Sequence, residues 1–315
     1  MNDPAAFTRE AIARLRTEVP GKAIVAASGG IDSTAAALLT ERALGDRARA
    51  VFVDTGLLRE GEVARVGALF RESGVRYEVV SAADRFLDAL AGVTDPEEKR
   101  RRIGAQFIGL FEEEARRFGA DRLVQGTIAP DWIESGGELR STIKTHHNVG
   151  GVPKGTQLVL VEPLRDLYKD EVRTLARHLG IPQPERQPFP GPGLAVRVDG
   201  PVTADRVRRA RVANAIVEEE VERAVAEKKM PCPWQYFAVL LGTRTVGVTG
   251  DNRVHGEAVS VRIVDSVDAM TATAASPPRS VLATIAERIT RELSGEVVRV
   301  LYDITDKPPA TIEWE

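Results

Sequence analysis

The sequence predicts an α/β domain built on a parallel sheet, followed by a smaller α+β domain. Through the first half of the chain, short apolar runs alternate with helical patterns, and this alternation is typical of βαβ units. Residues 182–193 then interrupt the pattern with prolines and glycines that can form neither a helix nor a central strand. The segment marks either the domain boundary or a rigid wall of the site. We place the boundary there, with residues 1–190 in the first domain and residues 191–315 in the second.

The first domain is expected to contain five strands with helices between them. Helices are expected over residues 5–17, from residue 35, over 60–71 and 95–118, and again from residue 163. The strands are the apolar runs at residues 23–27, 50–54, 75–80, 123–127 and 158–161. Because ligands bind beyond the carboxyl ends of parallel strands, the loops at Ser28 and Asp54 are expected to contact one nucleotide. Asp54 could equally be a simple cap at the end of its strand.

The second domain is expected to be a small α+β unit. It contains two predicted helices, 203–228 and 279–293, and three strand candidates, 243–249, 258–264 and 297–304. Arginine and glutamate alternate along the first helix, which indicates either a solvated face or a dimer contact. The last ten residues contain two prolines, an isoleucine and a tryptophan, so we expect them to pack rather than to fray.

Composition excludes several classes of protein. A chain of 315 residues suits two domains, and its net charge of −3 argues against a dedicated binder of nucleic acids or membrane surfaces. Cys232 is the only cysteine, which excludes a disulfide framework and a cysteine metal cluster. Nothing resembles a signal peptide, and no apolar run approaches the roughly 18 to 20 residues that a membrane span requires. The expected location is the cytoplasm.

Residues 28–34, S-G-G-I-D-S-T, form the loop with the strongest chemical signal. Two glycines between a strand and a helix let backbone N–H groups converge, and the helix N-terminus adds partial positive charge. This combination indicates a site for phosphate or pyrophosphate, although it has neither the Walker A spacing nor the G-x-G-x-x-G pattern. The alternative is a tight βα turn in which a serine caps the helix.

Two charged residues support the phosphate interpretation. A carboxylate beside a phosphate is repulsive unless a cation lies between them, so Asp32 indicates a Mg²⁺ ion. Lys169 falls in the first turn of a predicted helix, where a lysine is unfavourable against the helix dipole. Its position indicates a bound anion, and an ordinary surface lysine is an equal alternative.

Two further polar segments have open interpretations. Lys99-Arg100-Arg101-Arg102 is a basic run that could be a solvated helix face paired with its own glutamates. Residues 143–151 combine cations, amides and glycines, which is typical of a loop over a polar ligand. The histidine pair in that loop is more often loop filler than a metal site, so zinc is not expected.

The chain resembles a known family at several separate segments. S-G-G-I-D-S resembles the PP-loop of the ATP pyrophosphatases, and the combination of segments across the chain resembles GMP synthetase. The most specific are P-F-P-G-P-G-L at residues 188–194 and K-P-P-A-T-I-E-W-E at residues 307–315. The others lie at residues 28–34, 97–104, 125–127, 143–151 and 250–253. The resemblance implies a doubly wound parallel sheet of the adenine nucleotide alpha hydrolase type, followed by a small α+β dimerisation domain.

The resemblance also implies a reaction and its site residues. The family converts XMP to GMP: Mg·ATP adenylates O2 of xanthine and releases pyrophosphate, and ammonia then displaces AMP. The implied ATP contacts are Ser28, Gly29, Gly30, Ile31, Asp32, Ser33, Thr34 and Asp54, with Asp32 also holding the metal. The implied catalytic residues are Asp32, Lys169, Lys144 and His146, and His147 shares the lid-like loop with the last two. The implied XMP contacts are Arg100, Lys307 and Glu313.

One departure from the family's pattern concerns the source of ammonia. Single-chain members carry an N-terminal glutamine amidotransferase domain with a Cys-His-Glu triad. This chain begins just before the PP-loop, and its one cysteine lies far inside the second domain. We therefore expect a separate glutamine amidotransferase subunit as partner, free ammonia as a substitute, and by analogy a homodimer through the C-terminal domain.

Three alternatives belong to other classes. The PP-loop enzymes that modify tRNA also adenylate a base oxygen, but those that transfer sulfur need cysteines, and net basicity is missing here. Other amidating enzymes such as NAD synthetase share the loop without the C-terminal segment. The last alternative is an inactive nucleotide-binding module, against which Asp32 and the loop serines argue.

Overall fold

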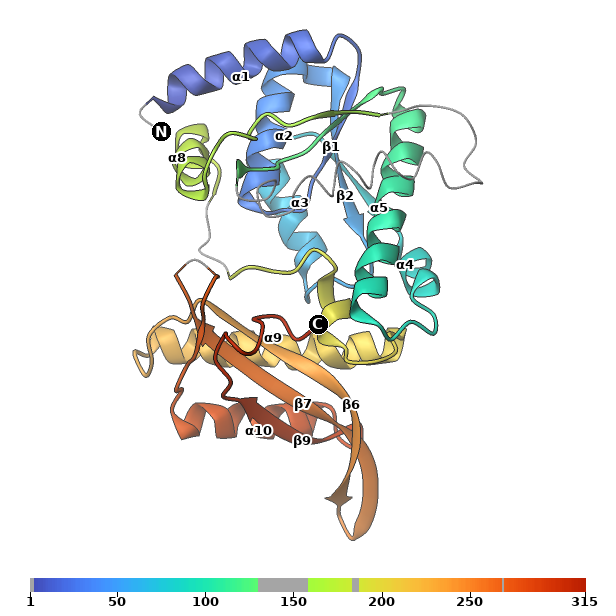
Figure 1. Cartoon of the computed structure of the whole chain (residues 1–315), viewed down its shortest axis with the longest axis vertical. Helices are drawn as coiled ribbons and strands as arrows, with labels where there is room; N and C mark the ends of the chain where they lie inside the picture. Colours follow the sequence, from blue (N-terminus) through green and yellow to red (C-terminus); the bar gives the residue numbers. More distant parts are fainter. Residues whose placement is uncertain (1–2, 130–157, 183–186, 268) are drawn as a thin grey trace. The chain divides into compact units, whose positions relative to one another are not determined.

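The computed structural model describes residues 3–129, 158–182, 187–267 and 269–315, and the described chain forms two compact units (Figure 1). Unit 1 comprises Met1–Asp54, Glu62–Ala82 and Ala105–Glu185. Unit 2 comprises Thr55–Gly61, Ala83–Gly104 and Arg186–Glu315. Unit 2 thus includes two short segments from the first half of the chain, which no sequence pattern indicated. The boundary near residue 190 stays a prediction.

Unit 1 contains the predicted parallel sheet of five strands. In the order β3-β2-β1-β4-β5, every neighbouring pair is parallel. The strands are β1 (Ala23–Ala26), β2 (Ala48–Asp54), β3 (Tyr77–Ser81), β4 (Arg122–Val124) and β5 (Val159–Val161). The chain moves outward from β1 to β3 and then returns to β4 on the other side of β1. This reversal creates a switch point between β1 and β4, where ligands of such sheets bind.

The helices of unit 1 cover both faces of that sheet, which makes it a doubly wound fold (Figure 1). α2 packs against α1 and α8 on one face, and α5 lies on the other. Residues of α2 such as Ala36 and Leu39 are fully buried. The bounds are α1 (Pro4–Glu18), α2 (Ile31–Leu44), the 3-10 turn η1 (Gly45–Arg47), α3 (Glu62–Glu72), α5 (Pro96–Phe118, which continues from unit 2) and α8 (Lys169–Leu179).

Unit 2 is the predicted α+β domain, built on a four-stranded sheet. β6 and β7 form a long antiparallel hairpin, β9 pairs with β7 in parallel, and β8 pairs with the end of β7. α9 packs against β6, and α10 packs against α9 and β9. The bounds are α4 (Ala83–Ala89), η2 (Gly193–Arg197), α9 (Ala204–Ala226), β6 (Gln235–Thr249), β7 (Asn252–Asp265), β8 (Thr273–Ala274), α10 (Arg279–Glu292) and β9 (Val297–Asp303).

Several elements of unit 2 differ from the prediction, among them β7, which begins six residues before the predicted start. β6 begins eight residues before the predicted start, because Tyr236 to Leu240 are all buried and the run therefore shows no alternation. β8 and α4 were not predicted, since two and seven residues are too short to show a period. None of the helices in the described ranges is both long and apolar enough to cross a membrane.

The C-terminal residues pack within unit 2, as the sequence predicted. Ile312 is 8% exposed and joins a buried cluster with Val264 and Ala272. Arg262, whose side chain is 1% exposed, donates hydrogen bonds to the carbonyl oxygens of Ile312 and Thr311. The tail is therefore held by apolar burial and by an arginine that bonds its backbone.

Candidate active site

The predicted phosphate loop lies between β1 and α2, at the carboxyl edge of the sheet. α2 begins at Ile31, and its N-cap is Gly30, which provides no side-chain hydrogen bond to the helix. The alternative of a serine N-cap is therefore wrong. A helix N-terminus that no side chain caps presents its first N–H groups to a ligand, and anions bind there readily.

Hydroxyl groups inside the loop fix its shape. Ser28 Oγ and Ser33 Oγ are 3.0 Å apart, and Ser33 Oγ also accepts a hydrogen bond from the Ser28 N–H over 3.1 Å. Thr34 is fully buried, and its hydroxyl donates to the Gly30 carbonyl over 2.8 Å. Thr34 is thus placed to shape the loop, whereas Ser28 is exposed.

Two glycines allow other segments to approach the loop. Gly29 has φ +76°, and a Cβ there would lie 2.3 Å from Val66 Cγ2 of α3. Gly126 follows β4, and a Cβ there would lie 2.7 Å from Ser33 N and 2.8 Å from the carbonyl of Asp32. The loop after β4 therefore lies directly against the start of α2, on the switch-point side of β1.

Asp32 and Lys169 form an ion pair beside the loop. Lys169 is the first residue of α8, and its Nζ lies 2.6 Å from Asp32 Oδ2. The other carboxylate oxygen, Asp32 Oδ1, is buried and has no hydrogen-bond partner among the described residues. A buried oxygen of this kind is costly to leave unpaired, and a cation would satisfy it.

The residues present fit a Mg²⁺ ion bound together with a nucleotide. No group of three or more acidic, histidine or cysteine side chains that could hold a metal occurs within the part of the chain that the structure describes. Mg²⁺ is usually held by one or two carboxylates together with substrate phosphates and water, so a single carboxylate beside a phosphate loop is sufficient. Asp32 matches that requirement.

Asp54 and Gln125 end the strands on either side of β1. Asp54 is the last residue of β2, and its carbonyl accepts a hydrogen bond from the Ala82 N–H over 2.8 Å. Its contact with ATP stays a prediction.

Gln125 follows β4, and its buried Oε1 has no partner among the described residues. Sequence reasoning named the segment that contains Gln125 but not this side chain, since an isolated glutamine carries no pattern. Lys144, His146 and His147 lie outside the described residues.

The basic run at the start of α5 divides into two environments. Arg101 and Arg102 bond Glu98 over 2.6 and 2.7 Å, and these hydrogen bonds lower the pKa of Glu98 to about 2. The solvated-face interpretation holds for this pair. For Lys99 it is wrong: the side chain is fully buried and donates to the Val198 carbonyl over 2.7 Å. Burial lowers the pKa of Lys99.

The predicted XMP contacts all lie on unit 2. Arg100 donates to the backbone carbonyl of Glu315, which brings the start of α5 to the C-terminal tail. Lys307 Nζ donates to the Ala269 carbonyl over 2.8 Å. Glu313 accepts two hydrogen bonds from Arg197 and one from Gln235. The structure therefore gathers Arg100 with the tail that carries Lys307 and Glu313.

Arg197 is the principal residue that sequence reasoning missed. It ends the short turn η2 in an apolar run, Leu194 to Val198, that gives no sign of a charged contact. Its side chain is fully buried against Glu313, 116 residues further along the chain. An arginine inside an apolar run is the one signal that could have indicated a buried ion pair.

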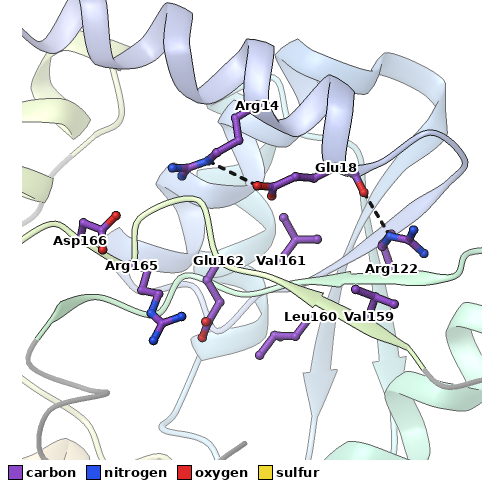
Figure 2. Close-up of a pocket in the computed structure, with 9 residues that line it drawn as sticks. All are labelled: Arg14, Glu18, Arg122, Val159, Leu160, Val161, Glu162, Arg165 and Asp166. Atoms are coloured by element: carbon purple, nitrogen blue, oxygen red, sulfur yellow. Dashed lines mark hydrogen bonds and ion pairs between the residues drawn. The ribbon is translucent and has the colours of Figure 1, made fainter. Parts of the chain in front are cut away.

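A separate pocket lies at the edge strand of the unit 1 sheet (Figure 2). Its volume is about 370 Å³, and charged side chains from α1 and the loop after β5 surround it. The lining residues are Arg14, Glu18, Arg122, Val159, Leu160, Val161, Glu162, Arg165 and Asp166. No predicted ATP or XMP residue within the described ranges is among them, so the predicted chemistry lies elsewhere.

Comparison with known proteins gives concordant matches. Residues 219–314 match the family model described as the GMP synthase C terminal domain. The chain is 59% identical to a subunit of GMP synthase [glutamine-hydrolyzing] from Pyrococcus horikoshii, over 98% of both chains. It is 57% identical to the subunit of the same name from Methanopyrus kandleri over the full length of both chains. The corresponding subunit from Thermoplasma acidophilum is 55% identical over 95% of both.

Proposed function

Because this chain belongs to the GMP synthase family, we propose that it performs the ATP-dependent amination of XMP to GMP. The observation that carries this conclusion is the identity of 59% over 98% of the chain to a subunit of a glutamine-hydrolyzing GMP synthase. The reaction is that of a ligase: ATP is cleaved to AMP and pyrophosphate, and a C–N bond is formed. A separate glutamine amidotransferase subunit supplies the ammonia.

In unit 1, residues 28–34 are proposed to hold the phosphates of ATP. The uncapped start of α2 supplies N–H donors for the leaving pyrophosphate, where charge develops as the bond to the α-phosphorus breaks. Asp32 is proposed to hold Mg²⁺, which when bound neutralises phosphate charge. Lys169 pairs with Asp32 Oδ2, which leaves Oδ1 for the proposed metal. We propose that the lysine also donates to a phosphate oxygen of ATP.

In unit 2, the proposed contacts of XMP are Arg100, Lys307 and Glu313. The guanidinium of Arg100 suits a phosphate, since it offers a fork of N–H donors. Lys307 adds a second cation, and the Glu313 carboxylate can accept a hydrogen bond from the base or the ribose. No side chain need act as a covalent nucleophile, because O2 of xanthine attacks the α-phosphorus directly and ammonia then displaces AMP from C2.

The remaining assignments are also proposals. Asp54 is proposed as a further ATP contact, and Lys144, His146 and His147 as members of a loop that closes over the reacting groups. Residues 1–190 would form the ATP pyrophosphatase domain, and residues 191–315 the XMP-binding domain that makes a homodimer. The relatives are named as single subunits of a glutamine-hydrolyzing enzyme, which supports a separate amidotransferase partner. Since the reaction consumes ATP, we propose that it takes place in the cytoplasm.

The test is the formation of AMP and GMP from ATP, Mg²⁺ and XMP, with ammonium chloride in one reaction and glutamine in another. We expect GMP with ammonium and none with glutamine until the amidotransferase subunit is added. Omitting Mg²⁺ should abolish both products. Failure to form GMP from ammonium, by folded protein with the partner subunit present, would contradict the proposal.

A further inference from the structure

The carboxylate of Glu313 is held by a side chain that cannot itself reach solvent. Glu313 is 20% exposed at its side chain, whereas the side chain of Arg197 is 0% exposed. Burying a guanidinium costs free energy unless the charge is paired and its N–H groups are bonded. The way in which Arg197 meets that requirement determines where the Glu313 carboxylate points.

The two side chains form a bidentate ion pair. Arg197 Nε donates to Glu313 Oε2 over 3.0 Å, and Arg197 Nη2 donates to Oε1 over 2.8 Å. Two parallel hydrogen bonds fix the plane of a carboxylate as well as its position. A lysine in the same place would keep the charge but would not fix that plane.

The guanidinium is in turn oriented by three other side chains. Arg197 Nη1 donates to Asn214 Oδ1 of α9 over 3.0 Å. The centre of the guanidinium lies 4.1 Å from the ring centroid of Phe237 in β6 and 5.1 Å from that of Phe189. Stacking against rings adds to the favourable energy of a desolvated guanidinium. These contacts hold the guanidinium of Arg197 in one orientation, and its hydrogen bonds in turn orient the Glu313 carboxylate.

One oxygen of Glu313 keeps capacity for another donor. Oε1 accepts from Arg197 and from Gln235 Nε2, the latter over 2.7 Å, whereas Oε2 accepts from Arg197 alone among the described residues. A carboxylate oxygen can accept more than one hydrogen bond. The Glu313 side chain is 20% exposed, so we take Oε2, the oxygen with fewer partners, as the atom that accepts from an N–H or O–H group of a ligand.

We infer that Arg197 is a positioning residue for XMP: its buried guanidinium holds Glu313 so that Oε2 accepts a hydrogen bond from the nucleotide. This inference rests on the proposed function, since it takes XMP as the ligand. The competing explanation is that Arg197 merely anchors the tail. Arg262 provides the comparison, because it is also buried and holds the same tail through the carbonyls of Thr311 and Ile312.

The experiment compares Arg197→Lys with Arg262→Lys in steady-state GMP formation with ammonium as the nitrogen source. We expect Arg197→Lys to raise the KM for XMP about 10- to 100-fold, since a misplaced contact group has effects of that order. The KM for ATP should stay within about twofold in the same variant. Arg262→Lys should lower the thermal midpoint while changing the KM for XMP far less.

A double-substitution cycle separates positioning from anchoring. If Arg197 acts through Glu313, then Arg197→Lys adds nothing to the KM for XMP once Glu313→Gln is present. Arg262→Lys, by contrast, should have the same effect with and without Glu313→Gln. Multiplicative effects of Arg197→Lys and Glu313→Gln would overturn the inference, as would equal KM changes in the two lysine variants.

Two further variants, Asn214→Ala and Glu313→Gln, test the inference even if Arg197→Lys does not fold. If Arg197→Lys does not fold, Asn214→Ala loosens the same guanidinium on the side away from Glu313, and it should raise the KM for XMP about threefold or more. An unchanged KM in Asn214→Ala, or in Glu313→Gln, overturns the inference. Since the unsubstituted protein would still form GMP in that event, this failure is distinct from failure of the proposed function.

Discussion

Replacing Gly126 with alanine would push a methyl group into the backbone of the phosphate loop. The added Cβ would lie 2.7 Å from Ser33 N and 2.8 Å from the carbonyl carbon and oxygen of Asp32. All three are backbone atoms at the start of α2, so no side-chain rotation relieves the overlap. Because ordinary contact begins at 3.4 Å, the Asp32–Ser33 peptide or the loop after β4 must move by about 0.7 Å.

That displacement sets the size of the expected effects. Overpacking of this kind costs about 1–3 kcal/mol of unfolding free energy, which corresponds to a fall of a few degrees in the thermal midpoint. A displacement near 1 Å can lower a rate about 100-fold. We therefore expect kcat/KM for ATP to fall roughly 10- to 100-fold in Gly126→Ala, with the KM for XMP changing much less.

The assay is pyrophosphate release with saturating XMP and ammonium, measured as ATP is varied. Gly104→Ala is the matched control, since a Cβ at that position in α5 meets nothing within 4 Å. Alanine is a better helix former than glycine by about 1 kcal/mol, so this variant should be at least as stable as the parent. Unchanged ATP kinetics in Gly126→Ala, at a lowered thermal midpoint, would refute the assignment of this loop to the ATP phosphates.

Three other predictions concern single charges. Asp32→Asn should lower kcat/KM for ATP about 100-fold and raise the Mg²⁺ concentration needed for half-maximal rate. Asp170→Asn, at an exposed position in α8, should change neither quantity. Equal Mg²⁺ titrations of the two variants would contradict the metal assignment. Lys307→Ala should raise the KM for XMP far more than that for ATP, and equal effects would remove Lys307 from the XMP site. Because the folded-state pKa of Glu98 is lowered from 4.5 to about 2, its ionised form stabilises the fold above its unfolded pKa, and this contribution disappears as the pH falls toward 2. The difference in thermal midpoint between the parent and Glu98→Gln should therefore narrow below about pH 4.5; a difference that stays constant would show that the ion pairs contribute nothing.

Local patterns in the sequence predicted the elements whose signals are contiguous. The strands of unit 1, the long helices α5 and α9, and the phosphate loop all show their period or composition within a few adjacent residues. The elements that escaped prediction lack such a signal. The start of β6 is apolar on both faces and so shows no alternation, and α4 is only seven residues long.

The candidate site shows the same division. The composition of residues 28–34 was sufficient to predict a phosphate-binding loop. The ion pair between Asp32 and Lys169 could be identified only from the fold, because 137 residues separate the two in the sequence. The basic run predicted cations, yet its local pattern could not separate buried Lys99 from solvated Arg101.

By itself, the sequence determined the α/β class, the order of the longer elements and the family to which the chain belongs. Only the tertiary structure decided which charged groups meet away from water. Arg197 lies in an apolar run and Glu313 lies in the C-terminal tail, 116 residues further along the chain. Nothing in either segment indicates that its charged residue pairs with the other. Such pairs depend on which distant segments the packing brings together, and their energy depends on the low dielectric that burial creates. A local pattern can indicate a buried charge, but it cannot identify the partner.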